Sequence, residues 1–373
     1  MPLYAFGSNG SGQLGIGHVD DVSIPTRCLF EGPEPEPLSN QSLILKPAHE
    51  QSPNGVLRIA AGGNHTLLLL PDGTVYAAGC NEDGRCGVSP GDPLLKFRRV
   101  VIHDPESECL YATFKDVSAS WEGTFLVERQ GERLFVLGSG AKGELGLGEG
   151  YVRALGPRCV TGFRQRIVSV ASGMGHTVVV LENGDVYGWG GARKGQLGED
   201  AKGRKIVWTP VRVEGVPFRA TGAACGREFT VVTGDRSRGE FVVLGSQGDR
   251  WGILSGPPLV TGYGGIAASW HGVYVHRGEG FVVAWGRNDR GQLPPADLPV
   301  VRELAVGSEH VLALVDGGKV VAFGWGEHGN CGPVADKRGD VKGRYIEIPV
   351  PGEEGSEVVG VGAGCATSWV VMS

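Results

Sequence analysis

The sequence of 373 residues predicts an all-β fold, a closed seven-bladed β-propeller built of four-stranded blades. Glycine occupies 64 positions, far above its usual share, which indicates a tight turn that recurs along the chain. A pattern of three short strands separated by turns and followed by a Gly-rich loop also recurs. We therefore expect residues 1–373 to form a single propeller domain.

The clearest copy of the repeat spans residues 167–198, where three strands precede a Gly-rich loop. The pattern recurs in five further segments, 56–87, 114–146, 218–253, 263–294 and 301–332. Seven glycines open the Gly-rich loops, at positions 7, 79, 138, 190, 245, 286 and 324, and their uneven spacing indicates loop insertions. Prolines such as Pro210 and Pro299 come before β-branched or basic residues and predict a fourth, outermost strand, where a missing N–H is tolerated.

The two chain ends predict how the ring closes. Residues 3–15 supply only the back half of a repeat, and residues 358–372 supply only the front half. A blade made from both ends leaves no open seam with free strand edges. We place the seventh blade in residues 3–30 and 358–373, and loop insertions near 31–55, 88–113 and 333–357, the last two containing the fourth strand of their blades.

Composition narrows the function classes. A net charge of −6 and a pI near 5.9 disfavour a general affinity for nucleic acid or anionic membranes. No leader-like segment follows Met1, and no apolar run approaches 18 residues, so we expect neither secretion nor membrane insertion. Eight scattered cysteines without a Cys-x-x-Cys pair suggest neither a zinc site nor a disulfide framework. We expect no metal, no cofactor and a cytoplasmic location, with the nucleus left open as a second one.

The repeats carry a family resemblance. Gly-x-x-His-Thr before an apolar strand and Asn-x-x-Gly-x-Leu-Gly after one resemble regulator-of-chromosome-condensation repeats, best at 62–66, 173–177 and 307–310. Four blades depart from the motif, with Gly123, Phe229, Gly272 and Thr367 at the histidine position. The resemblance spans nearly the whole chain and implies the seven-bladed propeller of that family.

A closer resemblance lies within the first ninety residues. The segments YAFGSNG (4–10), QLG (13–15), GH (17–18) and IAAGGNH (59–65) are similar to the fungal alpha-tubulin-suppressor, or killer-toxin-insensitivity, propeller. That family is the accessory partner of a small acidic zinc-binding protein shared by diphthamide synthesis and Elongator-dependent modification of tRNA wobble uridines. The resemblance implies an adaptor in a heterodimer with that protein, indirectly associated with Elongator and the diphthamide-synthesis enzymes and without direct nucleic-acid contact.

The histidines of the repeat motif argue against an enzymatic function. His65, His176 and His310 recur at equivalent positions, as structural residues do, whereas a catalytic constellation occurs once. We expect each of them to bond backbone near its Gly turn. No nucleophile elbow, phosphate loop or His-Glu-x-x-His motif is present, so we assign no catalytic residue. Two other functions stay open, a guanine-nucleotide exchange factor for a small GTPase, as in the founding propeller of the superfamily, and an unassigned interaction scaffold.

The expected blade geometry directs attention to one face, because the first and third turns of each blade must emerge on the same side. Arg and Trp on that side favour an interface with an acidic partner. The candidate partner-binding residues are Arg193, Arg227, Arg250, Trp251, Trp270, Arg287 and Arg290. Two alternatives stay open: the tryptophans could simply pack, and the rim also carries acids such as Glu122 and Glu228 that would make it a mixed, solvated surface.

Overall fold

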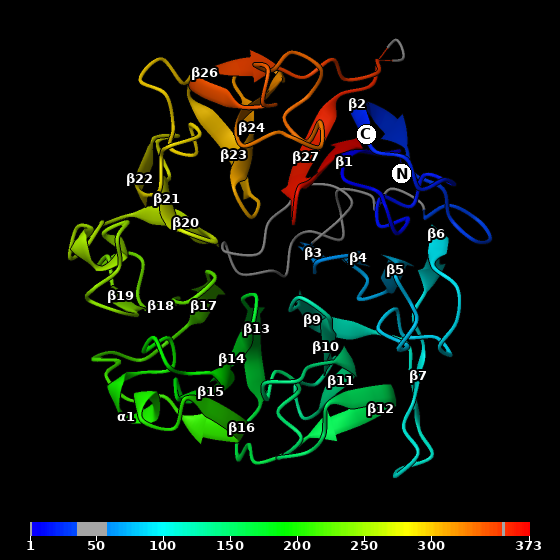
Figure 1. Ribbon diagram of the computed structural model, residues 1–373, viewed down its shortest axis with the longest axis vertical. Coiled ribbons are helices and arrows are strands. Elements are labelled where there is room, and N and C mark those ends of the chain that lie inside the picture. Colours follow the sequence, from blue (N-terminus) through cyan, green and yellow to red (C-terminus); the bar gives the residue numbers. More distant parts are fainter. Residues whose placement is uncertain (1, 36–57, 353–354) are drawn as a thin grey trace.

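The computed structural model describes residues 2–35, 58–352 and 355–373, and it confirms the seven-bladed propeller (Figure 1). Seven antiparallel sheets surround a central channel, and we number the blades in chain order. Helical structure among the described residues is confined to α1 (Glu199–Lys202) and η2 (Ile253–Ser255). No helix in the described ranges is long and apolar enough to cross a membrane.

Each blade begins with its innermost strand, at the channel. Blade 1 has β3 (Arg58–Ala61), β4 (His65–Leu69), β5 (Val75–Gly79) and β6 (Leu94–Arg99), and blade 2 has β9 (Phe114–Ala119), β10 (Gly123–Glu128), β11 (Leu134–Ser139) and β12 (Arg153–Val160). Blade 3 has β13 (Ile167–Ser172), β14 (His176–Leu181), β15 (Val186–Gly191) and β16 (Ile206–Arg212), and blade 6 has β23 (Val301–Val306), β24 (His310–Val315), β25 (Val320–Gly324) and β26 (Val341–Glu347).

Blade 7 joins the two chain ends, as predicted. Its order is β27 (Val358–Ala363), β28 (Thr367–Met372), β1 (Leu3–Gly7) and β2 (Val22–Arg27). Antiparallel pairing sets Ala5 opposite Trp369, and the amide of Met372 donates to the carbonyl of Pro2 over 2.9 Å. The ring is therefore closed by hydrogen bonds between the first and the last strand of the chain.

Blades 4 and 5 have three strands each in the described residues. They are β17 (Gly222–Cys225), β18 (Thr230–Thr233) and β19 (Phe241–Leu244), then β20 (Tyr263–Ser269), β21 (Gly272–Arg277) and β22 (Val282–Gly286). The fourth strand predicted at Pro299 is wrong, because Val301 already begins β23 of the next blade. Three prolines between β22 and β23, at 294, 295 and 299, supply no N–H for a ladder.

The predicted insertions differ in content. Residues 88–113 hold β6 and a small hairpin, β7 (Ile102–His103) with β8 (Leu110–Tyr111), and residues 333–357 hold β26. The segment 31–55 lies outside the described residues apart from its first five.

Glycine recurs for a geometric reason. The residue that opens a Gly-rich loop takes a positive φ in six blades, for example +109° at Gly79. A Cβ at Gly79 would lie 2.4 Å from the carbonyl oxygen of Asn64, in the first turn of the same blade. The loop and that turn pack backbone against backbone, and only glycine permits this approach.

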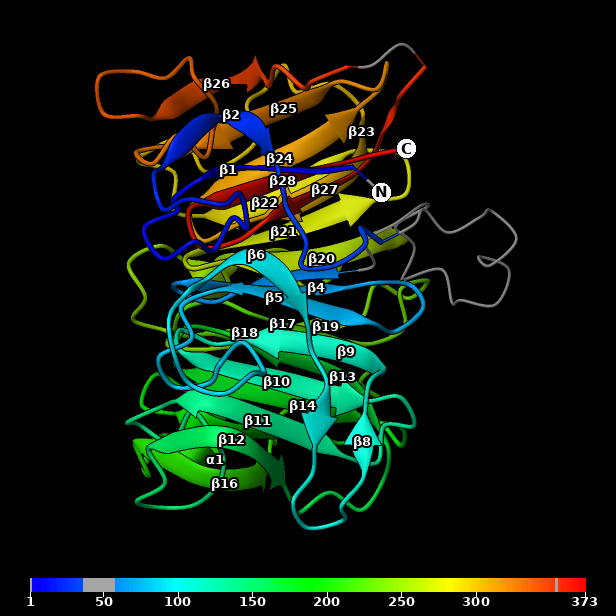
Figure 2. The ribbon, with the colours of Figure 1, turned by 90° about the vertical axis from the view of Figure 1, so that its right-hand side faces the viewer.

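The blades stack through apolar side chains. Strands β4, β10, β14, β24 and β28 are buried along their whole length. Trp189 is fully buried against blade 2, where its indole N–H donates to the carbonyl of Glu144 over 2.8 Å. The first turns and the Gly-rich loops emerge on one side, which we call the loop face, and the chain ends lie on the other, the rear face (Figure 2).

Candidate functional site

The three repeated histidines join neighbouring blades. Each imidazole is fully buried, and its Nε2 lies 2.9 Å from a hydroxyl of the next blade: His65 with Thr124, His176 with Thr230 and His310 with Ser368. The prediction that each imidazole bonds backbone near its Gly turn is wrong, because Nε2 bonds the hydroxyl of the adjacent blade instead.

The protonation of these histidines follows from the hydroxyl. Each hydroxyl donates its single proton to a carbonyl in the Gly-rich loop of the histidine's own blade, those of Arg85, Gln196 and Asn330. The imidazole Nε2 must then be the donor, and Nδ1 of each ring has no partner among the described residues. Burial lowers the pKa of His65 to about 3 and the pKa of His176 and His310 to about 4. These histidines stabilise the contacts between blades.

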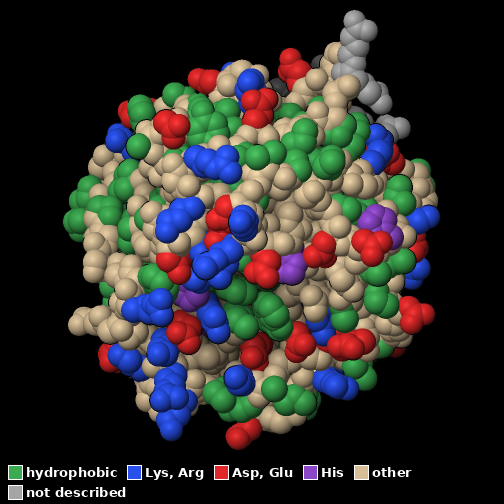
Figure 3. All heavy atoms as spheres, turned by 45° about the horizontal axis from the view of Figure 1, so that its top comes forward, with side chains coloured by type: hydrophobic (Ala, Val, Ile, Leu, Met, Phe, Trp, Pro, Cys, Tyr) green, Lys and Arg blue, Asp and Glu red, His purple; other side chains and the backbone are tan. Residues whose placement is uncertain are grey.

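The predicted partner-binding residues gather in part. Arg227, Arg250, Trp251, Trp270 and Arg287 come together on the loop face over blades 4 and 5. We call these five, with His271, the Arg/Trp cluster. Figure 3 shows Lys and Arg side chains collected on the side of this face where β19 and β22 lie in Figure 1.

Two of the predicted partner-binding residues lie outside the Arg/Trp cluster. Arg290 lies 3.6 Å from Asp340 of blade 6, so its guanidinium serves an ion pair between blades 5 and 6. Arg193 is exposed in the Gly-rich loop of blade 3, and no contact joins it to the cluster among the described residues.

The centre of the cluster is Trp251. The Cζ atoms of Arg250 and Arg287 lie 4.0 Å and 5.1 Å from the centroid of its ring, and the ring of His271 lies 6.2 Å away. A second cation–π contact places Arg227 5.7 Å from the ring of Trp270. Guanidinium groups against an indole face hold their position while keeping N–H donors for an incoming anion.

A buried carboxylate supports this arrangement from below. Glu309, which is 4% exposed, accepts hydrogen bonds from His271 Nδ1 and Gln292 Nε2, both over 2.7 Å, and from Arg287 over 3.1 Å. Although burial opposes the change, the bonds from His271 and Gln292 lower the pKa of Glu309. Glu309 therefore stays ionised and fixes both His271 and Arg287.

The two arginines beside Trp251 consequently differ in their ion pairs. Arg287 also bonds Asp289 over 2.6 and 3.0 Å, and this bond, the strongest influence, raises its pKa. Arg250 is exposed and forms no ion pair with any carboxylate of the described residues. Arg287 is therefore fixed beside the indole, whereas Arg250 presents an exposed guanidinium.

A pocket of about 300 Å³ opens beside the cluster, between blades 4 and 5. Its apolar lining comes from Phe229, Ile253 and Leu254 together with the two indoles. Its charged lining residues include Lys194, Arg250 and the exposed Glu228. The carboxylate of Asp249 is already bonded to the amides of Trp251 and Ile253. The apolar lining is large enough to accommodate an apolar side chain.

The cluster extends to the channel through an indole pair. The rings of Trp121, in the first turn of blade 2, and Trp270, in the first turn of blade 5, have centroids 5.9 Å apart. Beneath them lies a channel cavity of about 520 Å³ lined mostly by glycine, alanine and serine of the inner strands. The sequence singled out Trp270, but not its contact with Trp121, nor the role of His271 and Glu309, which come from different blades.

A rigid ring that gathers cationic and aromatic side chains on one face is the architecture of a protein-binding propeller. The model of the RCC1-like domain matches residues 2–370, so the chain belongs to that family. It is 29% identical to an RCC1 repeat-containing protein of Schizosaccharomyces pombe, with 99% of this chain and 98% of the relative covered. It is 28% identical to the secretion-regulating guanine nucleotide exchange factor of Bos taurus, covering 94% and 78%. The crystal structure of human WBSCR16 superposes with a TM-score of 0.73, 18% identity and full coverage of both chains.

Proposed function

We propose that this chain is a protein-binding adaptor whose Arg/Trp cluster holds an acidic partner. The observation that carries the proposal is the position of Trp251 between two guanidinium groups, one anchored by Glu309 and Asp289 and one exposed. Trp and Arg are the residues that most often dominate interface energetics. The cluster is a local cationic surface on a chain of net charge −6, which favours an acidic segment.

For the partner we propose the small acidic zinc-binding protein shared by diphthamide synthesis and Elongator-dependent tRNA modification. The support is the N-terminal resemblance at residues 4–18 and 59–65, together with the charge of the cluster. The chain would form a heterodimer with it in the cytoplasm, where both pathways act on the translation machinery. Contact with Elongator or the diphthamide-synthesis enzymes would then be indirect.

The test is calorimetric titration of the purified zinc protein into the full chain and two variants. Arg250→Glu reverses the exposed charge, and Trp251→Ala removes the indole without altering net charge. Truncating a central interface anchor costs about 2 kcal/mol or more, roughly a thirtyfold loss of affinity. Arg164→Glu, an exposed change between β12 and β13 on the rear face, is the matched control. Equal binding by all four proteins, or none by the parent, would refute the assignment.

A second candidate function is guanine-nucleotide exchange on a small GTPase. It is favoured by the similarity to the secretion-regulating guanine nucleotide exchange factor, which covers 94% of this chain. The discriminating measurement is release of a fluorescent guanine nucleotide from a panel of small GTPases, with and without the chain. Accelerated release that Arg250→Glu abolishes would favour exchange over the adaptor function.

A further inference from the structure

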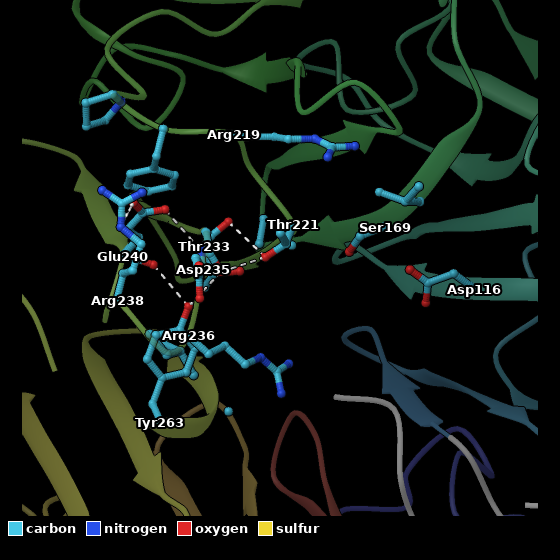
Figure 4. Close-up of a pocket in the computed structure, with 18 of the residues that line it drawn as sticks. Asp116, Ser169, Arg219, Thr221, Thr233, Asp235, Arg236, Arg238, Glu240 and Tyr263 are labelled. Atoms are coloured by element: carbon cyan, nitrogen blue, oxygen red, sulfur yellow. Dashed lines mark hydrogen bonds and ion pairs between the residues drawn. The ribbon is translucent and has the colours of Figure 1, made fainter. Parts of the chain in front are cut away.

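A third cavity lies on the rear face, on the side opposite the Arg/Trp cluster. It encloses about 940 Å³ at the mouth of the channel and is bounded by the starts of the inner strands β9, β13 and β17 and by the turn between β18 and β19 (Figure 4). Clefts of this size accommodate small-molecule ligands or extended side chains. The function proposed above makes no use of it.

Cationic side chains outnumber acidic ones around this cavity. Its lining contains five cations, Arg58, Lys115, Arg219, Arg236 and Arg238, and three carboxylates, Asp116, Asp235 and Glu240. The formal sum of the lining is therefore +2 on a chain whose net charge is −6.

All three carboxylates are committed to the protein itself. Asp116 accepts from Arg58 over 2.5 Å and from the amide of Val170 over 2.8 Å, which ties blades 1, 2 and 3 together. Asp235 caps its own turn by accepting from the amide and hydroxyl of Ser237. Glu240 pairs with Arg238 over 3.2 Å.

Three cations are left without a carboxylate among the described residues: Lys115, Arg219 and Arg236. Arg219 donates to the carbonyl of Glu182, and Arg236 donates to that of Gly264 over 2.7 Å. Figure 4 shows the side chains of Arg219 and Arg236 extending past the turn toward the part of the cavity where Asp116 and Ser169 lie. Each guanidinium keeps further N–H donors beyond its one carbonyl bond.

Arg236 is the more buried of the two arginines that lack a carboxylate partner among the described residues. Its guanidinium is half-buried, and Cζ lies 5.9 Å from the centroid of the Tyr263 ring. Burial lowers the pKa of Arg236, whereas hydrogen bonds to Asp289 raise the pKa of Arg287 in the other site. A partly desolvated guanidinium gains most from an oxyanion that supplies the missing charge and accepts two N–H bonds.

We propose that the rear-face cavity is a binding site for a multiply charged oxyanion, a phosphate or carboxylate group that accepts N–H bonds from Arg236, with Arg219 and Lys115 supplying further positive charge from the same lining. Phe218 and Tyr263 line the same cavity and offer an apolar wall to the body of a ligand that carries the anion. The site is independent of the adaptor function, since the two faces share none of the residues involved.

Calorimetric titration at constant ionic strength tests the site, with inorganic pyrophosphate as the phosphate probe and citrate as the carboxylate probe. We expect one equivalent of at least one probe to bind the full chain, and Arg236→Gln to weaken that binding at least tenfold. Arg219→Gln, at an exposed position, should weaken it severalfold and keeps the test open if the half-buried Arg236 proves necessary for folding. Binding of pyrophosphate alone identifies a phosphate ligand, and binding of citrate alone identifies a carboxylate.

The control is Arg164→Gln, which removes an exposed rear-face charge outside the cavity lining. The proposal is overturned if neither probe binds, or if Arg164→Gln weakens binding as much as Arg236→Gln does. Capture of the zinc protein by Arg236→Gln should equal that of the parent chain, so failure of this site is distinguishable from failure of the adaptor function.

Discussion

The Nε2 atom of His176 in blade 3 lies 2.9 Å from the hydroxyl oxygen of Thr230 in blade 4, and that hydroxyl donates to the carbonyl of Gln196 back in blade 3. The pair closes a short, fully buried hydrogen-bonded bridge between the two sheets. Blades 1 and 2 and blades 6 and 7 carry the same bridge. The histidines of the repeat motif thus act on the junctions between blades.

Removing the hydroxyl from this bridge should destabilise the ring. Thr230→Val keeps the volume of the side chain but leaves the buried N–H of His176 and the carbonyl of Gln196 without a partner. An unsatisfied buried group costs about 1–3 kcal/mol in free energy of unfolding. Urea denaturation should show this loss, while Thr209→Val, at an exposed position of β16, should change little. Equal stability of the two variants would contradict the role of the bridge.

Stability should fall as the pH drops from 6.5 toward 4. The buried histidines bind a proton in the folded state only near pH 3–4, but near 6.5 in the unfolded state. Between those values the unfolded chain binds more protons, so acid favours unfolding. Each histidine should contribute about 2 kcal/mol of lost stability between pH 7.5 and pH 5.

Replacing one buried histidine tests this pH dependence. Phenylalanine is the matched replacement, since blade 4 has Phe229 at the histidine position. His176→Phe should remove about one third of the histidine contribution to the pH dependence, whatever its effect on stability at pH 7.5. The unfolding midpoint in urea, measured at both pH values, checks this. An unchanged difference between the two midpoints would show that His176 does not titrate on unfolding.

Removing either chain end should prevent folding. Deletion of residues 358–373 takes away β27 and β28, which exposes the paired edge of β1 and the side of blade 6 that packs on β27. Circular dichroism and limited proteolysis should then report an unfolded chain. A circular permutant that links Ser373 to Pro2 and opens the chain at 161–166 keeps every strand, so it should remain folded. A stable truncated protein would mean that blade 7 is dispensable.

Salt should weaken binding of an acidic partner by the Arg/Trp cluster. Exposed charges are screened beyond about 8 Å at physiological ionic strength, which lowers the association rate. Arg250→Gln should flatten the dependence of the association rate on salt, whereas Arg164→Gln should not. Surface plasmon resonance from 50 to 500 mM salt gives both slopes. Salt-independent association would rule out electrostatic steering by this face.

Much of the fold was predictable because its signals are local. The Gly turns, the strand periods and the half-repeats at the two ends each occupy a few consecutive residues, and they indicated seven blades and a closed ring. The fourth strand expected at Pro299 was wrong, because Val301 already begins β23 of blade 6 and the described residues between β22 and β23 form no strand against β22.

The candidate site was predictable only in part. Blade geometry placed Arg and Trp residues on one face, but it could not show which of them are already committed to ion pairs. Arg287 pairs with Glu309 of another blade, and Arg290 pairs with Asp340 of blade 6. The sequence by itself determined the repeat, the class of fold and the face on which these side chains emerge. Only the tertiary structure decided which of them meet, because contacts between blades join residues tens of positions apart whose spacing carries no local signal.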